Sequence, residues 1–245
     1  EAHETAMRTC APGMNEAEIH AGLMHTFIRN QCEASYLPIV AGGANACVLH
    51  YITNNEELHE GDLLLIDAGA ELDGYASDIT RTFPVGGKFS PEQRALYDIV
   101  LEAQRQAIDT VRAGKQWQEV HDAAVRVATE GMIELGIMKG ELDQILEKKE
   151  FKRFYVHNTG HWLGLDVHDV GEYTIDGHSR ELEPGMVLTV EPGIYIPPET
   201  DDVDECWRGM GIRIEDNVAV TRDEPRILTD GLARSADEIE DLMAA

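Results

Sequence analysis

Four carboxylates interrupt stretches of the sequence that otherwise read as buried β-strands. Asp67 follows the apolar run LLLI, and Asp78 follows GYAS a little further along. Glu191 ends the apolar run in MVLTVEPG, and Glu215 ends the one in MGIRIEDN. A lone Asp is more often a turn or cap residue, but four such acids exceed what helix caps explain. Because burying an isolated ionised carboxylate is costly, the fold has to pair these groups or bind a cation between them.

The segment HNTGHWLGLDVHD supplies nitrogen atoms that complement these acids. It contains three histidines, His157, His161 and His168, beside glycines that permit close approach of the backbone. A single histidine is more often a core or surface residue than a ligand. Three histidines close together beside Gly and Trp favour a metal-binding site. His161 and the four carboxylates suit two hard or borderline divalent ions such as manganese, cobalt or zinc. Thiolates are absent from this set, which argues against a structural zinc site.

The chain begins with helical patterns and then changes to short strands. Asn15 and Glu18 form a capping-box pattern before an apolar stripe, which predicts a helix over residues 15–31. The β-branched stretch that follows is broken by glycines at 42–43, which predicts two short strands around a turn. We expect His50 to lie on the second of these strands.

The segment GDLLLIDAGAELDGYASDITRTFPV, residues 61–85, is typical of a hairpin. Its turn falls near Asp73 and Gly74. Asp67 then lies on the outgoing strand and Asp78 on the returning strand, so that two acids face each other.

The rest of the chain repeats the order of helices followed by strands. Ser90 and Gln93 open a helix that runs to about residue 111, and a second helix follows over about 116–135. Three later stretches read as strands and a last helix closes the chain: 154–170, 186–198, 211–221 and 236–243. This order predicts an α+β domain built from two similar halves, each ending in a hairpin that bears acids.

The charge and the cysteines limit the classes of partner. Asp and Glu number 46 against 20 Lys and Arg, and the formal net charge of -26 repels nucleic acid and anionic lipid headgroups. The acidic stretch after Pro197 reads as a solvated loop. No apolar run approaches the roughly 20 residues of a membrane span. Four scattered cysteines without a CxxC pair favour free thiols and a reducing cytoplasm: Cys10, Cys32, Cys47 and Cys206.

Four segments closely resemble the catalytic domain of Xaa-Pro aminopeptidase (aminopeptidase P), a sister of prolidase among the pita-bread metallopeptidases. They are IDAGAELDGYASDITRTFPV, HNTGHWLGLDVHDVGEY, VLTVEPGIYIPP and RGMGIRIEDNVAVT. The resemblance runs from about residue 1 to the C-terminus with matching order and spacing. It implies a pita-bread fold, in which two pseudo-symmetric halves of helices and antiparallel strands surround a dinuclear metal site. Residues 1–245 then form one catalytic domain, and the family's usual N-terminal domain is absent.

The resemblance also implies roles for the five metal ligands. Asp67 would bind one ion, and His161 and Glu191 would bind the other. Asp78 and Glu215 would bridge the two ions, for which manganese is expected first and cobalt or zinc are alternatives. Glu191 would also take the proton from the attacking water.

Further residues match the active site of the family. His50, His157 and His168 would contact the substrate, stabilise the tetrahedral intermediate and help to move protons. Arg213 matches an arginine that orients an acidic ligand, which is compatible with an ordinary salt bridge. Tyr36 matches a tyrosine of the substrate pocket, although a core aromatic explains it equally well.

The function implied by the resemblance is hydrolysis of the bond between an N-terminal residue and a following proline, through a hydroxide that bridges the metal ions. Prolidase, which is restricted to dipeptides, is the nearest alternative. Methionine aminopeptidase and a non-catalytic pita-bread protein that binds histones or nucleic acid are further alternatives. The expected partners are peptides with proline in second position and a second copy of the chain, without nucleic acid or membrane. The chain begins at Glu1 and not at Met, so further sequence upstream is an alternative that we keep.

Overall fold

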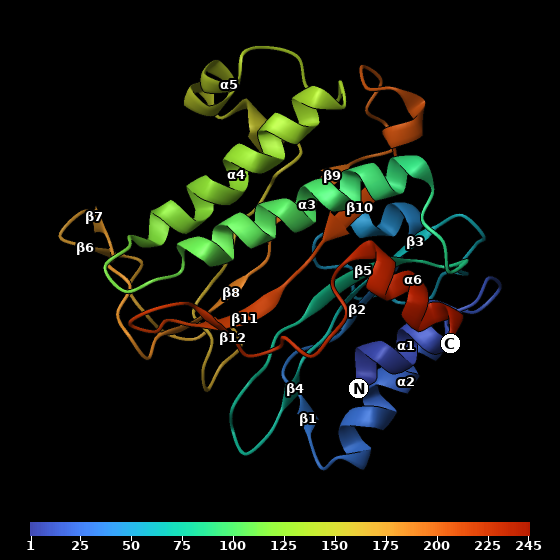
Figure 1. Ribbon diagram of the computed structural model, residues 1–245. Helices are drawn as coiled ribbons and strands as arrows, with labels where there is room; N and C mark the ends of the chain where they lie inside the picture. Colours follow the sequence, from blue (N-terminus) through green and yellow to red (C-terminus); the bar gives the residue numbers. More distant parts are fainter.

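Two antiparallel three-stranded sheets and a two-stranded ribbon form the centre of the molecule (Figure 1). A computed structural model describes all residues, 1–245. The first sheet has the order β2–β3–β5: Ile39–Gly42, Leu63–Asp67 and Thr80–Pro84. The second has the order β8–β11–β12: Val187–Val190, Asp216–Ala219 and Arg226–Ile227. The ribbon pairs β9 with β10: Gly193–Ile196 and Met210–Arg213.

The ribbon joins the two sheets. Two extended segments, residues 187–196 and 210–219, run antiparallel to each other. The first consists of β8 and β9 and the second of β10 and β11, with one break between the strands of each segment. Strand β10 also contacts β3 and β5 of the first sheet. The two halves of the chain therefore meet along β10. Two short strand pairs lie outside these sheets: β1 (Glu33–Ala34) with β4 (Ala70–Glu71), and β6 (Thr174–Ile175) with β7 (His178–Ser179).

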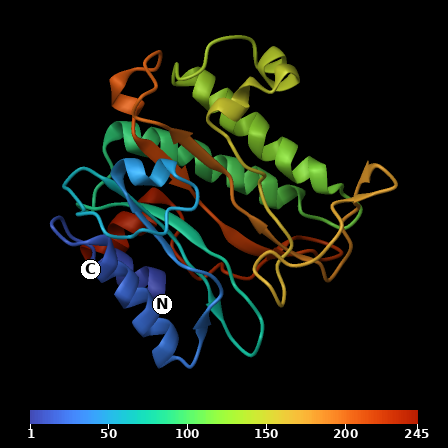
Figure 2. The ribbon, with the colours of Figure 1, turned by 180° about the vertical axis from the view of Figure 1, so that it is seen from behind.

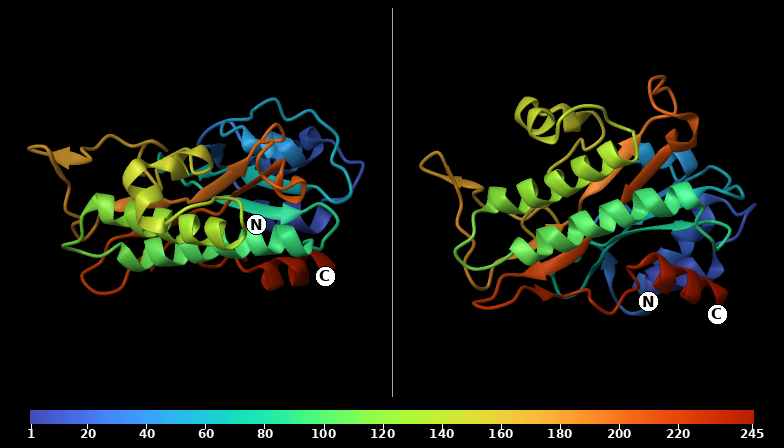
Figure 3. Two further views of the ribbon diagram at one scale, coloured as in Figure 1. Left: turned by 90° about the horizontal axis from the view of Figure 1, so that it is seen from above. Right: turned by 45° about the horizontal axis from the view of Figure 1, so that its top comes forward.

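Two long helices, α3 (Pro91–Thr110) and α4 (Trp117–Glu134), pack against each other and cover one face of the strands (Figure 3). Ser90 begins α3 with a capping box, because its side chain accepts from the backbone of Gln93 while the Gln93 side chain accepts from the backbone of Ser90. The apolar stripe of α3 recurs at helical spacing, is fully buried and contacts β8, β9 and β10: Leu96, Val100, Ala103 and Ala107.

Three helices gather at one end of the molecule and bring the two chain termini close together (Figures 1 and 2). Helix α1 contacts both α2 and α6. Their bounds are Ala2–Thr9, Glu16–Arg29 and Ala236–Ala244. The remaining helical pieces are α5 (Leu142–Lys148), η1 (Gly43–Cys47), η2 (Glu150–Arg153) and η3 (Glu205–Trp207). No helix has the length and hydropathy that crossing a membrane requires.

The predicted helices and the hairpin of residues 61–85 are confirmed, but the strand expected to carry His50 is wrong. Residues 43–47 form a 3-10 turn, and no regular strand follows before β3. Gly43 takes a φ of +53°, which turns the chain out of the sheet at the end of β2. Asp78 likewise lies two residues ahead of β5 rather than within it.

The strand expected over residues 154–170 is also wrong, and the short helix α5 was not predicted. Within this segment only Trp162 forms an isolated bridge, to Leu188 of β8. The backbone N–H of His161 donates to the side-chain hydroxyl of Thr189 at 3.0 Å, so this N–H does not take part in a regular β-ladder. The segment nevertheless runs beside β8, which places its histidines next to the sheet.

Candidate metal centre

Each of the four acids lies where a strand ends or breaks. Asp67 is the last residue of β3, and Asp78 precedes β5. Glu191 lies in the break between β8 and β9, and Glu215 lies in the break between β10 and β11. At the second break the backbone pairs with the other half of the molecule, because Glu215 N donates to the carbonyl of Thr80 at 3.0 Å. The four carboxylates thus come from separate elements of both halves.

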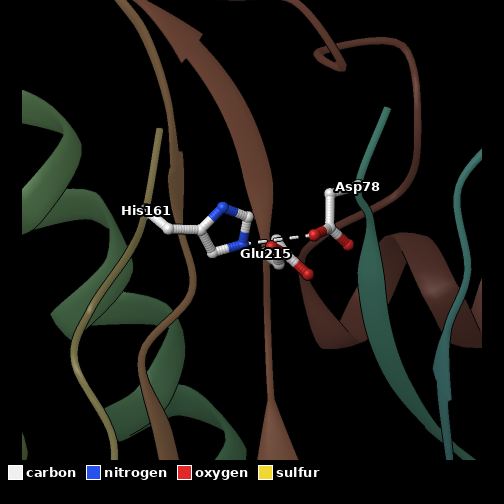
Figure 4. A group of neighbouring side chains, drawn as sticks. All are labelled: Asp78, His161 and Glu215. Atoms are coloured by element: carbon white, nitrogen blue, oxygen red, sulfur yellow. Dashed lines mark ion pairs between the residues drawn. The ribbon is translucent and has the colours of Figure 1, made fainter. Parts of the chain in front are cut away.

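Three of the predicted ligands converge directly. Asp78, His161 and Glu215 each offer one ligand atom, and these atoms lie within 4.8 Å of one another. Figure 4 shows the three side chains pointing toward a common region from three separate segments. Nε2 of His161 lies 3.3 Å from Oδ2 of Asp78 and 3.4 Å from Oε1 of Glu191. Glu191 therefore joins the group beside the imidazole.

Asp67 is connected to this group by two shared partners. The hydroxyl of Tyr36 lies within hydrogen-bond distance of both Asp67 and Asp78. Nη2 of Arg213 donates to Oδ2 of Asp67 at 2.7 Å. Tyr36 does not line the cavity in front of the carboxylates. That cavity of about 740 Å³ brings together the other residues predicted from the sequence: Asp67, Asp78, His161, Glu191, Glu215, His50, His157, His168 and Arg213.

Burial governs the protonation of the acids. Desolvation, reinforced by the neighbouring carboxylates, raises the pKa of Glu215 well above its usual range. Desolvation also raises the pKa of Asp78 to about 6 and that of Glu191 to about 7. Burial lowers the pKa of His161, but its hydrogen bond to Asp78 and the charge of Glu191 outweigh this effect and raise it to about 9. The side chains alone therefore hold protons that a bound cation would displace.

One buried oxygen atom tests whether a cation fits here. Oε2 of Glu215 accepts from the hydroxyl of Thr80 at 2.6 Å, whereas Oε1 is buried and has no hydrogen-bond partner. Native proteins leave few buried polar atoms in this state. Carboxylate oxygens and an imidazole nitrogen are donors that hard or borderline divalent ions accept. The donor set and the unpartnered oxygen together fit a divalent metal ion.

A chain of hydrogen bonds links His157 to Asp67. Nη1 of Arg213 donates to the hydroxyl of Tyr195 at 2.9 Å, and this hydroxyl lies 2.7 Å from Nε2 of His157. Nδ1 of His157 lies 2.7 Å from the carbonyl of Asn158. Burial, followed by the charge of Arg213, lowers the pKa of His157 to about 3. His157 is therefore neutral, with a tautomer that donates through Nδ1 and accepts from Tyr195 through Nε2.

The other two predicted histidines lie at the open side of the cavity. The ring of His168 meets the ring of His161 edge to face, with centroids 4.3 Å apart. Burial, followed by the charge of His161, lowers the pKa of His168. His50 is exposed and lies on the loop after η1.

Several residues that line the cavity or contact its lining were not predicted from the sequence. Tyr195 lies in the buried run GIYI, where an aromatic residue is ordinarily part of the core. Trp117 and His121 lie four residues apart near the start of α4, so they face the same side, and this spacing was the available signal. Trp117 contacts Tyr173, with ring centroids 4.8 Å apart, and Nδ1 of His121 lies 2.9 Å from the hydroxyl of Thr159.

The sequence matches a model of metallopeptidase family M24 over residues 1–222. The chain belongs to metallopeptidase family M24. This M24 chain is 50% identical to the Xaa-Pro aminopeptidase of Haemophilus influenzae over 242 residues, which cover 98% of the chain and 56% of that relative. It is 49% identical to the Xaa-Pro aminopeptidase of Escherichia coli, covering 100% of the chain and 55% of the relative. The M24 chain thus spans about half the length of the relatives that it matches.

Solved structures agree with this membership. The aminopeptidase PepP of Pseudomonas aeruginosa superposes with a TM-score of 0.98 at 52% identity, covering 99% of the M24 chain and 55% of that structure. A zinc-substituted aminopeptidase P of Escherichia coli in complex with product superposes with a TM-score of 0.96 at 48% identity, covering 99% and 55%. The α+β pita-bread fold and the resemblance to this metallopeptidase family are therefore confirmed.

Proposed function

We propose that this M24 chain carries the active site of a Xaa-Pro aminopeptidase, which releases the N-terminal residue from peptides with proline in second position. The observation that carries the proposal is the convergence of four carboxylates and one imidazole in a single cavity, with Oε1 of Glu215 buried and unpartnered. Relatives with 50% and 49% sequence identity to this chain are Xaa-Pro aminopeptidases, which favours this activity over prolidase or methionine aminopeptidase.

The five residues would hold two divalent ions. In this proposal Asp67 binds one ion, His161 and Glu191 bind the other, and Asp78 and Glu215 contact both. Manganese is our first expectation, and zinc is supported by the zinc-substituted relative of known structure. When bound, such ions acidify water and polarise the carbonyl of the bond to be cleaved.

The side chains of the protein have separate tasks around that centre. Glu191, whose pKa burial raises to about 7, is suited to accept the proton of the attacking water and to pass it to the leaving proline nitrogen. Arg213 keeps Asp67 oriented through its 2.7 Å ion pair.

The histidines act on the substrate. His157, neutral and fixed by Tyr195 and by the carbonyl of Asn158, lines the cavity, where its ring can contact the bound peptide. His50 and His168 stand at the open side of the cavity, where they can contact the substrate and stabilise the charge that develops on its carbonyl oxygen.

The proposal extends to the setting of the enzyme. The four cysteines are free thiols, which supports a cytoplasmic location. The net charge of -26 supports peptides rather than nucleic acid as partners. A homo-oligomer is our expectation from the family resemblance.

The decisive experiment is cleavage of a Xaa-Pro-Xaa tripeptide by the metal-stripped chain with and without added manganese, beside an Asp78→Ala variant. A Xaa-Pro dipeptide and a Met-Ala peptide are run in parallel. We expect manganese-dependent release of the first residue from the tripeptide, and its loss in the variant. Preferred cleavage of the dipeptide would instead identify a prolidase, and equal turnover of the Met-Ala peptide would remove the proline specificity. Metal binding without any cleavage would contradict the proposal for this chain.

A further inference from the structure

A second fully buried carboxylate lies outside the metal centre. Glu16 is the first residue of α2, directly after its cap Asn15, and its exposed fraction is 0%. No lysine or arginine pairs with it. A buried charge without a cation needs several hydrogen-bond donors, so the donors reveal what the residue holds.

Four donors surround the Glu16 carboxylate. Oε1 accepts from Gly42 N at 2.8 Å and from Asn45 Nδ2 at 3.1 Å. Oε2 accepts from the hydroxyl of Tyr51 at 2.8 Å and from Glu56 N at 3.0 Å. Both oxygens are therefore saturated by groups that lie 26 to 40 residues further along the chain.

These donors bracket one segment, residues 43–56, which we name the His50 loop. Gly42 and Glu56 lie at its two ends, and Asn45 and Tyr51 lie within it. One carboxylate thus closes the loop and ties it to the start of α2. On its other side the loop packs on β10, where Gly211 approaches so closely that an added Cβ would lie 2.3 Å from the carbonyl oxygen of Ala46.

The position of His50 depends on this backbone. His50 lines the cavity but is exposed, and no hydrogen bond of the structure involves its ring. Its neighbour Tyr51 donates directly to Glu16. A ring that has no partner of its own is placed by the residues that fix its main chain.

We propose that Glu16 is a positioning residue for catalysis, because it holds the His50 loop and thereby aims His50 into the cavity. The inference rests on the proposed function, since the role of His50 in cleavage belongs to that proposal. Glu16 itself does not line the cavity, so its effect passes through the loop.

Replacement of Glu16 by Gln tests this role with little change of shape. Whichever way the amide is turned, its NH₂ group faces a backbone N–H, either that of Gly42 or that of Glu56. One end of the loop is then released. The matched control is Glu18→Gln, because Glu18 lies in the same first turn, is exposed, and accepts only from Asn15 N at 2.8 Å. Both variants remove one charge from the N-terminus of α2.

The readouts are steady-state kinetics on the Xaa-Pro-Xaa tripeptide and hydrogen–deuterium exchange of residues 43–56. We expect Glu16→Gln to lower kcat by about tenfold with a smaller change in KM, which is less than the roughly 10²–10⁴-fold of a lost acid–base group because the His50 ring is displaced and not removed. Exchange in the His50 loop should accelerate, while Glu18→Gln changes neither quantity. In the double variant with His50→Ala, the Glu16 substitution should cause no further loss, because both act through one ring.

Two results would overturn the inference: unchanged exchange in residues 43–56 of Glu16→Gln, or a fully additive loss in the double variant. Tyr51→Phe removes one of the four donors, and it should show the same effects at smaller size even if Glu16→Gln fails to fold. Exchange is measured without substrate. An inactive parent chain would therefore contradict the proposed function, while the anchoring by Glu16 would still be decided by exchange.

Discussion

Glu215 and Asp216 are consecutive buried acids with opposite surroundings. Their exposed fractions are 1% and 0%, and Glu215 lines the cavity of the metal centre whereas Asp216 does not. Asp216 pairs with Arg81 at 2.9 Å and with Arg234 at 3.3 Å, and it accepts from Gln104 at 2.9 Å. Glu215 has no cationic side chain as a partner, and one of its oxygens is unpartnered.

The comparison distinguishes a carboxylate that stabilises the fold, Asp216, from one that is suited to bind a cation, Glu215. Asp216 is neutralised by arginines of the chain, so its cluster is complete when the protein folds. Glu215 faces Asp78 and Glu191, which are acids like itself, so its pKa is raised and its carboxyl holds a proton that a bound cation would displace. Both side chains are buried carboxylic acids, and only their neighbours distinguish them.

Glu215→Gln should give the largest functional effect. With manganese present, we expect cleavage of the Xaa-Pro-Xaa tripeptide to fall by about 10⁴-fold, equal to roughly 5.5 kcal/mol of transition-state stabilisation. The unfolding free energy of the metal-stripped chain should change little, because burial and the neighbouring acids raise the pKa of Glu215, and a neutral amide of the same shape replaces a carboxyl that already holds a proton. Activity within tenfold of the parent chain would place the metal elsewhere.

Asp216→Asn should give the largest structural effect. It leaves the buried guanidinium of Arg81 without its carboxylate, and removal of one partner from a buried pair costs about 3–5 kcal/mol. Urea unfolding of the metal-stripped variant measures this loss beside Glu215→Gln as the matched neighbour. If the two variants were equally stable, the contrast between the two acids would be lost.

Thr80→Val tests whether the hydrogen bond to Glu215 orients this carboxylate for metal binding. The buried Thr80 hydroxyl donates to Glu215 at 2.6 Å and accepts from Nε of Arg213 at 3.1 Å. We expect manganese affinity, measured by titration calorimetry, to fall by about 10- to 100-fold. Thr129→Val is the control, since that buried hydroxyl bonds only within α4. Equal affinity of both variants would show that Thr80 does not orient the ligand.

The pH dependence of stability should give the smallest effect. The pKa values of Asp78 and Glu191 are raised in the fold to about 6 and about 7, so ionisation of these groups destabilises the metal-free chain as pH rises from about 4 to 7. The raised pKa of His161 contributes stability below about 6.5 that is lost as pH rises toward 9.

Both contributions therefore have the same sign. We expect the metal-stripped chain to lose about 1–2 kcal/mol between pH 5 and pH 8, and manganese to reverse the loss because it replaces the protons. Unfolding curves at the two pH values, with and without manganese, measure both quantities. A metal-free chain that gained stability over this range would contradict the pKa directions of the cluster.

The sequence singles out Glu215 at the end of an apolar run, but it makes no prediction for the buried Asp216 beside it. Glu215 and Asp216 end the same apolar run, and their different partners follow from the tertiary structure. Arg81, the partner of Asp216, lies 135 residues earlier, and no local pattern joins the two. The four acids could be singled out because each interrupts a stretch that reads as a strand. Their partners could not be predicted, because tertiary contacts decide them.

The same reason explains the wrong strand at His50. The His50 loop contains β-branched and apolar residues, which favour a strand by local propensity. The side chain of Glu16 instead satisfies backbone groups at both ends of the loop, and Gly43 turns the chain away. Helices α3 and α4 were predicted correctly because their caps and apolar stripes are local signals.

The four acids lie at strand ends and breaks. Because of this placement, the stability of the fold depends little on the side chains that are proposed to bind metal. Asp67 is the last residue of β3 and the other three acids lie outside the strands, so a change of their side chains leaves the backbone pairing of both sheets in place. A descendant of this architecture can consequently lose every ligand by point mutation and still fold. Assigning activity within such a lineage thus requires inspection of these few positions one by one, whatever the degree of overall likeness.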